Sequence, residues 1–276
     1  MKMITQVDVQ KLYRPPKDSH KGQNGRLLVI GGSELFHASI FWAADVASRI
    51  VDLVHFSSPS AENSDVVRKR AKEKFWNGIV VPWRRVEEYI REDDCILIGP
   101  GMPRRDGLES GEMPTDEIVN RLFKKFPDKR WVVDGGAVQE MDPELLNEHM
   151  IITPHAGEFK RLFGKDASAR AAQRMAKKHG CVVLLKGIVD LVCDGKRCLE
   201  VAGGNEGMTK GGTGDVLAGL VGAFYCKNEG FLAASAGSFV NKRAGDLLHK
   251  RVGPFFNASD LVAEIPLVMN DVLRYS

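Results

Sequence analysis

The sequence has few cysteines and no long hydrophobic run. Its five cysteines form no Cys-x-x-Cys pair, and their number is odd. This pattern argues against a structural zinc site and against a disulfide framework. Two of them, Cys95 and Cys181, begin apolar runs and are expected to be buried as small hydrophobic residues. No apolar stretch approaches membrane-spanning length, and the N-terminus lacks the apolar region of a signal peptide. We therefore expect a cytoplasmic protein that makes no contact with a membrane.

The chain also lacks a strong excess of either charge. Its 39 basic and 36 acidic residues leave a net charge of +3, and the two signs are interspersed. Without a broad basic face, binding to nucleic acid is not expected. The 276 residues are 43% hydrophobic, which is ordinary for a globular protein, and no internal repeat or interdomain linker is evident. The sequence therefore predicts one domain over residues 1–276.

Short apolar runs alternate with amphipathic stretches through the first two thirds of the chain. The runs are continuous and rich in Val, Ile and Leu, which is typical of strands covered on both faces. The expected strands are 27–30, 53–56, 79–81, 96–98, 131–133, 151–153 and 182–185. The expected helices between them are 39–50, 62–74, 116–126, 157–163 and 167–178. This alternation predicts a mostly parallel α/β sheet with helices on both faces, a three-layer α/β/α architecture.

The pattern changes near the C-terminus. Residues 189–192 and 197–201 flank an Asp-Gly turn and predict a β-hairpin. Three helices are expected to follow, at 215–226, 231–249 and 258–273. The apolar, small-residue stretch Phe231–Val240 suits either a subunit interface or an internal position. The longest expected loop, 102–114, is long enough to be mobile.

The segment from Asn205 to Gly219 carries the strongest functional signal. Its glycine-rich part, 211–214, leads into Asp215 and then an apolar run that reads as a helix. The free amides of a helix N-terminus bind anions, and glycine lets a phosphate approach the backbone. A carboxylate at that turn is suited to removing a proton from a hydroxyl that attacks the phosphate. No Walker A loop is present. The structural alternative is a glycine-rich connector capped by Asp215.

Several marked residues directly follow expected strands. Ligands of open α/β sheets bind beyond the carboxyl ends of the strands, so these residues are expected to meet at one edge. Lys186 ends an apolar strand, and a buried lysine needs an anionic partner. Glu158 suits the start of a helix. The residues that follow strands are Gly31–Ser33, Gly99–Gly101, Asp134–Gly136, His155 and Lys186–Gly187.

Five stretches, taken together and in order, resemble the ribokinase-like superfamily and, more narrowly, the ADP- or ATP-dependent NAD(P)H-hydrate dehydratases. They are 20–33, Ile98–Gly101, Ile152–Phe159, Val183–Gly187 and Asn205–Gly219. The resemblance implies a ribokinase-like fold and a lyase that repairs the S epimer of hydrated NADH or NADPH. ADP, or else ATP, would phosphorylate the added hydroxyl, and loss of phosphate would restore the dihydronicotinamide ring.

The same resemblance implies roles for individual residues. The catalytic residues would be Asp215, as base, with Gly212, Thr213 and Gly214. The nucleotide-binding residues would be Lys186, Gly187, Ile188, Val189, Asp190 and Gly214. The substrate contacts would be Ser39, Gly101, His155 and Asp215. Mg²⁺ is expected to accompany the nucleotide, with no protein ligand assigned to it. Relatives form oligomers, so a homo-oligomer is expected.

Three positions depart from the family pattern. Ser39 replaces an alanine expected near the substrate, and Gly136 replaces the second aspartate of an Asp-Ala-Asp-Ala motif. Lys210 stands where a small residue is commoner, either beside the phosphates or facing solvent. Two other functions stay open on this evidence. One is a small-molecule kinase of the same superfamily, of the thiazole- or pyrimidine-alcohol type, and the other is a non-catalytic nucleotide-binding sensor.

Overall fold

A single ten-stranded sheet forms the centre of the computed structural model, which describes residues 1–60, 65, 69, 77–108, 111 and 113–273. The strands are β1 (Lys2–Met3), β2 (Arg26–Ile30), β3 (Leu53–Ser57), β4 (Ile79–Val80), β5 (Cys95–Ile98), β6 (Arg130–Val133), β7 (Met150–Ile152), β8 (Val182–Leu185), β9 (Asp190–Cys193) and β10 (Cys198–Val201). Their spatial order is β1-β10-β9-β8-β7-β6-β5-β2-β3-β4.

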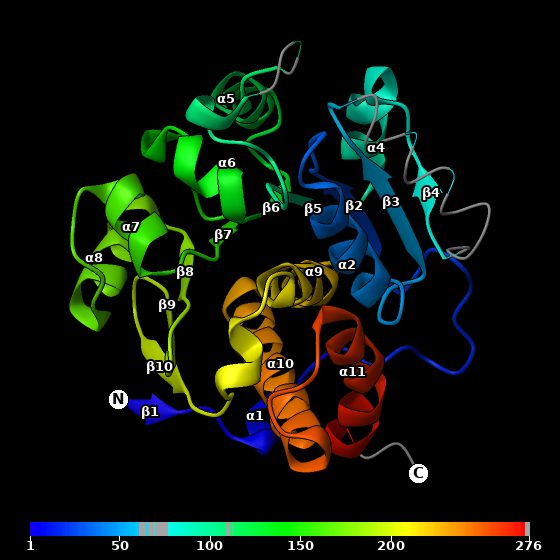
Figure 1. The fold of residues 1–276 in the computed structure, drawn as a ribbon, viewed down its shortest axis with the longest axis vertical. Coiled ribbons are helices and arrows are strands. Elements are labelled where there is room, and N and C mark those ends of the chain that lie inside the picture. The colour runs from blue at the N-terminus through cyan, green and yellow to red at the C-terminus, as the bar shows by residue number, and fades with distance from the viewer. Residues whose placement is uncertain (61–64, 66–68, 70–76, 109–110, 112, 274–276) are drawn as a thin grey trace.

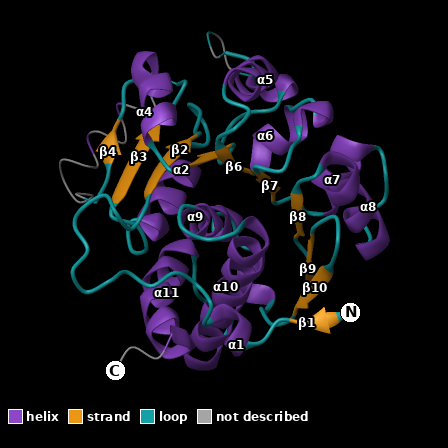
Figure 2. Ribbon diagram, turned by 180° about the vertical axis from the view of Figure 1, so that it is seen from behind, coloured by secondary structure: helices purple, strands orange, loops and turns teal. Residues whose placement is uncertain are grey.

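The sheet is parallel over most of its width. All the pairings from β4 across to β8 are parallel, and β9 runs antiparallel to both β8 and β10. The predicted hairpin is thus confirmed as β9–β10. Strand β1 was not expected, and it pairs in parallel with β10 at one edge of the sheet, opposite the edge formed by β4 (Figure 2).

Helices cover both faces of this sheet, as predicted. They are α1 (Gln6–Val9), α2 (His37–Ala47), α4 (Val86–Glu92), α5 (Thr115–Lys125), α6 (Gly135–Glu140), α7 (Ala156–Phe163), α8 (Ala169–His179), α9 (Thr213–Tyr225), α10 (Gly230–Val252) and α11 (Ala258–Leu273). Figure 1 shows α9, α10 and α11 gathered on one face and α5 to α8 on the other. Along β2, Leu27 and Val29 pack against the first group, whereas Leu28 and Ile30 pack against the second.

The expected strands and most expected helices lie close to their predicted positions. Helices α1, α4 and α6 were not predicted, because none of them is long enough to show a clear helical period. The helix expected at 62–74 lies almost entirely outside the described residues. In the loop expected at 102–114, residues 105–107 form a 3₁₀ turn, and the Thr115 hydroxyl donates to the Pro103 carbonyl at 2.6 Å.

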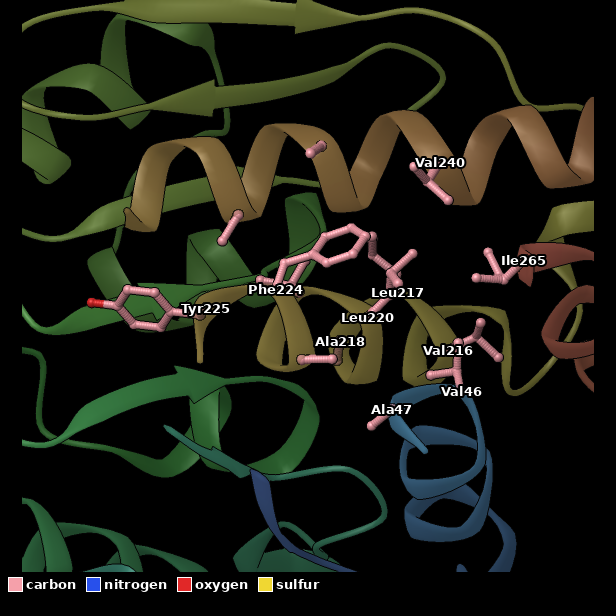
Figure 3. Close-up of a cluster of buried hydrophobic side chains, with 14 of the residues drawn as sticks. Val46, Ala47, Val216, Leu217, Ala218, Leu220, Phe224, Tyr225, Val240 and Ile265 are labelled. Carbon is pink, nitrogen blue, oxygen red and sulfur yellow. The ribbon is translucent and has the colours of Figure 1, made fainter. Parts of the chain in front are cut away.

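Helix α9 occupies the centre of one helical layer. Its side chains pack against α2 below, α10 above and α11 at one end (Figure 3). Val216, Leu220 and Phe224 are among the buried residues of this helix, at 0–3% exposure. The N-terminal half of α10, Phe231–Val240, is largely buried in the same core, which confirms the internal alternative for that stretch. The start of α9 is therefore held rigidly by packing along the length of the helix.

The cysteines differ in part from expectation. Cys95 and Cys181 are free and buried, as predicted. Cys193 and Cys198, however, form a disulfide across the β9–β10 hairpin. Antiparallel pairing places these two residues directly opposite each other, with Cα atoms 4.2 Å apart. The spacing of the cysteines could not show this, because the strand register decides it. Within the described part of the chain, no helix has the length and apolar character needed to span a membrane.

Candidate functional site

The turns that follow the parallel strands meet at one edge of the sheet, as the sequence predicted. They lie so close that side chains would not fit between them. A Cβ added to Gly99 would lie 1.8 Å from the carbonyl oxygen of Asp134, and one added to Gly31 would lie 2.2 Å from that of Pro100. Farther along the edge, His155 and Lys186 form a parallel backbone bridge. The turns after β2, β5, β6, β7 and β8 therefore form one continuous surface.

The glycine-rich segment forms the start of α9 at this edge. Gly212 has φ of +94°, a left-handed conformation that favours glycine, and a Cβ there would collide with the ring of Trp42. The helix begins at Thr213, two residues before the predicted start, so Asp215 lies inside the first turn. The Thr213 hydroxyl donates to the carbonyls of residues 208 and 210 at 2.7 and 2.9 Å. Among the described residues outside α9, a Cβ added to Gly214 would have the Lys186 ammonium as its one neighbour within 4 Å, at 3.9 Å.

Lys186 has the anionic partner that its burial requires. Its ammonium lies 2.7 Å from Oδ1 of Asp134 and 3.7 Å from Oε2 of Glu158. Burial alone would lower the pKa of Lys186, but these two carboxylates outweigh burial and raise it, so the residue stays charged. Asp134 is held in turn by the Thr153 hydroxyl at 2.6 Å. The positive charge of Lys186 therefore sits inside a network of acidic residues.

Asp215 lies next to this network and is itself half-buried. Burial raises the pKa of its carboxyl to about 7, and the negative charges of Asp134 and Glu158 add to the rise. A hydrogen bond from Ser39 and the positive charge of Lys186 act in the opposite direction. A carboxylate with a pKa near neutrality is well matched to general-base catalysis.

His155 and Glu158 cap the start of α7. The Nδ1 atom of His155 accepts hydrogen bonds from the amides of Gly157 and Glu158 at 3.0 and 3.2 Å. In return, a Glu158 carboxylate oxygen accepts from the His155 amide at 2.8 Å, which completes a capping box. The predicted helix-start role of Glu158 is thus confirmed. Because Nδ1 accepts two hydrogen bonds, the proton of the neutral imidazole belongs on Nε2, which remains able to donate.

A cavity of about 750 Å³ opens beside the start of α9. Its volume falls in the range typical of small-molecule sites. It is lined by His155, Lys186, Gly187, Ile188, Asp190, Gly203, Gly204, Asn205, Glu206, Met208, Thr209, Thr213, Gly214, Leu217, Asn241 and Lys242. Most of the residues predicted to bind a nucleotide are therefore brought together, although Val189 is not among those that line the cavity.

The predicted substrate contacts separate into two groups. His155 lines the cavity described above, whereas Ser39 and Gly101 lie outside it. Ser39 and Gly101 are neighbours, since a Cβ on Gly101 would lie 3.1 Å from the Cβ of Ser39. The Ser39 side chain is also close enough to Asp215 for hydrogen bonding to lower the pKa of the Asp215 carboxyl. Asp215 therefore lies between Gly214, which lines the cavity, and Ser39 in the first turn of α2.

The structure accounts for two of the departures from the family pattern. A Cβ on Gly136 would lie 2.0 Å from the Met102 carbonyl oxygen, so no side chain fits at this position in this chain. Lys210 neither faces the cavity nor points freely into solvent. Its ammonium donates to the carbonyls of Pro254 and Phe256 and lies over the Phe256 ring. Lys210 thus ties the segment before α9 to the connection between α10 and α11.

Sequence reasoning assigned no binding role to the far wall of the cavity, although Asn205 and Met208 lie in the segment from Asn205 to Gly219 that it singled out. This wall comes from the segment after β10 and from α10, and its members include Gly203, Asn205, Met208, Asn241 and Lys242. The available signal was the polar run Asn241-Lys242-Arg243, which directly follows the apolar stretch Phe231–Val240 of the same helix. Both side chains are buried, at 4% and 7% exposure. Buried polar residues require partners and are therefore informative.

The acidic residues of the site do not form a metal cage of their own. Among the residues that the structure describes, no group of three or more His, Cys, Asp or Glu side chains is arranged to hold a metal ion. Asp134 and Glu158 are already paired with Lys186. This arrangement suits a Mg²⁺ ion bound mainly through the phosphates of a nucleotide, because Mg²⁺ needs few protein ligands in such sites.

Comparison with known proteins gives a consistent result. A family model described as NAD(P)H-hydrate dehydratase matches residues 27–267. The bifunctional NAD(P)H-hydrate repair enzyme Nnr of Archaeoglobus fulgidus is 35% identical over 272 residues, which cover 94% of this chain and 54% of that protein. The ADP-dependent (S)-NAD(P)H-hydrate dehydratase of Cenarchaeum symbiosum is 34% identical, with 97% of this chain and 96% of that protein covered. The chain thus spans about half the length of the bifunctional relative and nearly all of the monofunctional one.

Solved structures show the same fold. A ribokinase-like superfamily protein from Enterococcus faecalis aligns with a TM-score of 0.85 at 21% identity, covering 99% of this chain and 97% of that one. The ADP/ATP-dependent NAD(P)H-hydrate dehydratase of Bacillus subtilis, co-crystallised with ATP/Mg²⁺, aligns with a TM-score of 0.80 at 20% identity, covering 98% of each chain. The chain therefore has the ribokinase-like fold that its sequence predicted.

Proposed function

The chain belongs to the NAD(P)H-hydrate dehydratase family, and from this premise we propose that it repairs the S epimer of hydrated NADH or NADPH in a reaction driven by ADP. ATP is the alternative donor. The observation that carries the proposal is the position of Asp215. Its carboxyl, with a pKa of about 7, lies between a cavity of nucleotide size and the neighbouring residues Ser39 and Gly101. A base at this junction can reach a hydroxyl on one ligand and the phosphate of another.

In the first step, Asp215 removes the proton of the added hydroxyl as its oxygen attacks the terminal phosphorus of the nucleotide. A new oxygen–phosphorus bond forms, and the bond from phosphorus to the oxygen of the leaving nucleotide breaks, which releases AMP when ADP is the donor. The first-turn amides near Gly214 point toward the transferred phosphoryl group and stabilise its negative charge. Mg²⁺ bound to the phosphates would neutralise further charge.

In the second step, the carbon–oxygen bond breaks and phosphate leaves with the electron pair. Loss of a proton from the neighbouring ring carbon restores the double bond of the dihydronicotinamide. Hydroxide is a poor leaving group, and phosphorylation replaces it with a much better one. A small-molecule kinase would share the first step and stop there, keeping its product phosphorylated.

The test is recovery of the reduced-nicotinamide absorbance band, near ~340 nm, in a reaction driven by phosphoryl transfer. The protein is mixed with hydrated NADH shown to contain the S epimer, Mg²⁺ and either ADP or ATP. We expect nucleotide-dependent recovery, faster with ADP, together with release of inorganic phosphate. A stable phosphorylated product without phosphate release would indicate the kinase, and nucleotide binding without any turnover would indicate the sensor.

The pH dependence of this reaction follows from the raised pKa of Asp215. The base must be ionised, so kcat/KM is expected to fall about tenfold per pH unit below the pKa of about 7 and to level off above it. Because the hydrogen bond from Ser39 favours the ionised form, Ser39→Ala is expected to move the midpoint to higher pH. Ser48→Ala is the matched control, since Ser48 caps the other end of α2. A midpoint that stays in place in Ser39→Ala would remove Ser39 from this role.

A further inference from the structure

Asn241 has an unusual position in the wall of the large cavity. The residue lies in α10, is 4% exposed and lines the cavity. Its Oδ1 atom is buried and has no hydrogen-bond partner within the described structure. A buried amide oxygen without a partner costs roughly 1–3 kcal/mol, so such groups in folded proteins normally meet a ligand or an ordered water.

The charged residues beside Asn241 are already committed to the structure of the cavity wall. Lys242 donates to the carbonyls of Gly187, Ile188 and Gly203 at 3.0–3.1 Å and lies 3.4 Å from Asp190. Asp190 accepts from the Gly187 amide at 2.8 Å and from the Ser238 hydroxyl at 2.7 Å. These contacts hold the loop after β8 and the segment after β10 together. They also leave neither charge free for a ligand.

The other polar side chains in this part of the cavity are also in use. Asn205 accepts from the Gly207 amide and donates to Asp246. Thr209 donates to the Glu206 carbonyl at 2.8 Å. The Thr213 hydroxyl is held by two carbonyls, as described above. Among the described residues lining the cavity, Asn241 is therefore the buried side chain whose polar group is still available.

The cavity lining contains both polar and apolar residues. Lys186 and Gly214 lie beside Asp215, where the proposed function places the phosphates. The remaining lining contains Ile188, Met208 and Leu217, which are suited to the faces of an aromatic base. Asn241 lines the same cavity, and its amide is the group left to pair with the polar edge of a base.

We propose that Asn241 selects adenine by hydrogen bonding to the edge of the base. The assignment rests on the proposed function in one respect, namely that the cavity binds a nucleotide. An amide carries one acceptor and one donor group, and adenine offers the complement: the amino group at position 6 donates and the adjacent ring nitrogen accepts. On the edge formed by positions 6 and 7, hypoxanthine and guanine present two acceptors, the carbonyl oxygen and the ring nitrogen, so neither can donate to Oδ1 there.

The test compares binding of ADP and inosine diphosphate by titration calorimetry in the absence of hydrate. The two ligands share ribose and phosphates and differ in the base edge. We expect the wild type to bind ADP at least about tenfold more tightly, within the ~1–3 kcal/mol typical of a paired amide–adenine contact. Asn241→Leu keeps the side-chain volume and removes the amide. It is expected to weaken ADP about tenfold and to leave inosine diphosphate unchanged.

Arg243→Leu is the matched control, because Arg243 lies two residues along the same helix and is exposed. It is expected to preserve the preference for ADP. The proposal would be overturned if the wild type bound the two diphosphates with equal affinity or bound neither. It would also be overturned if Asn241→Leu weakened the binding of both diphosphates equally. A preference that depends on Asn241, without recovery of the nicotinamide band, would instead refute the dehydratase and leave the adenine assignment intact.

Discussion

Asp215→Asn is expected to lower the turnover of hydrated NADH by about 10²-fold or more, which is the usual size of a general-base contribution. Asparagine has nearly the same shape but accepts no proton, so the substrate hydroxyl keeps its proton during attack on phosphorus. Gly214 and Lys186 are unchanged, so the affinity for ADP is expected to stay close to that of the wild type. Single-turnover kinetics with saturating ADP, together with titration calorimetry, measure the two quantities separately. Unchanged turnover would remove Asp215 from the role of base.

The same substitution is expected to stabilise the protein at alkaline pH. An acid whose pKa rises on folding, here from 3.8 to about 7, loses native-state stability as pH increases between those values. Above pH 7 the wild type carries an ionised Asp215 close to Asp134 and Glu158, and the variant does not. Its melting temperature is therefore expected to exceed that of the wild type at pH 8, and the difference is expected to vanish near pH 4. Opposite changes in activity and stability would identify a residue kept for catalysis.

Lys186→Met is expected to lower the free energy of unfolding by about 3 kcal/mol or more, the usual cost of removing one partner from a buried ion pair. Methionine fills a similar volume, but Asp134 and Glu158 lose their common counter-ion while staying buried at 3% and 5% exposure. Urea denaturation at pH 8, where both carboxylates are ionised in the unfolded chain, measures the effect.

Two further variants separate burial from simple charge removal. Lys160 pairs with Asp166 at 2.9 Å, but both side chains are exposed, so Lys160→Met is expected to leave the urea midpoint unchanged. Adding Asp134→Asn to Lys186→Met removes one of the stranded charges. The double variant is expected to be less destabilised than the sum of the two single variants. Strict additivity would contradict the assigned ion pair.

Much of the architecture could be predicted because it depends on residues close together in the chain. The continuous apolar run of β2 and the alternation of such runs with amphipathic stretches predicted a parallel sheet covered on both faces. The glycines before Asp215 predicted a helix start with exposed amides. The turns after β5, β6 and β8 could be assigned to one edge, because parallel strands all end on the same side.

Other features were wrong or missing because they depend on partners far away in sequence. The bond between Cys193 and Cys198 required the register of two strands, which a count of cysteines does not contain. Lys210 was considered for the phosphates or for solvent, and it binds carbonyls of residues 254 and 256 instead. The buried position of Asn241 in the cavity wall became visible only once α10 was placed against the loop after β8.

By itself, the sequence determined the fold class, the edge of the sheet where the site lies and the turn that carries Asp215. Apolar periodicity and glycine-rich turns act over a few residues, so they can be read along the chain. Tertiary structure alone decided that Lys186 is neutralised by Asp134, 52 residues away, and that Asp215 titrates near pH 7. The physical reason is that burial and charge–charge interactions depend on distances in space, which exist only once the sheet and its helices have packed together.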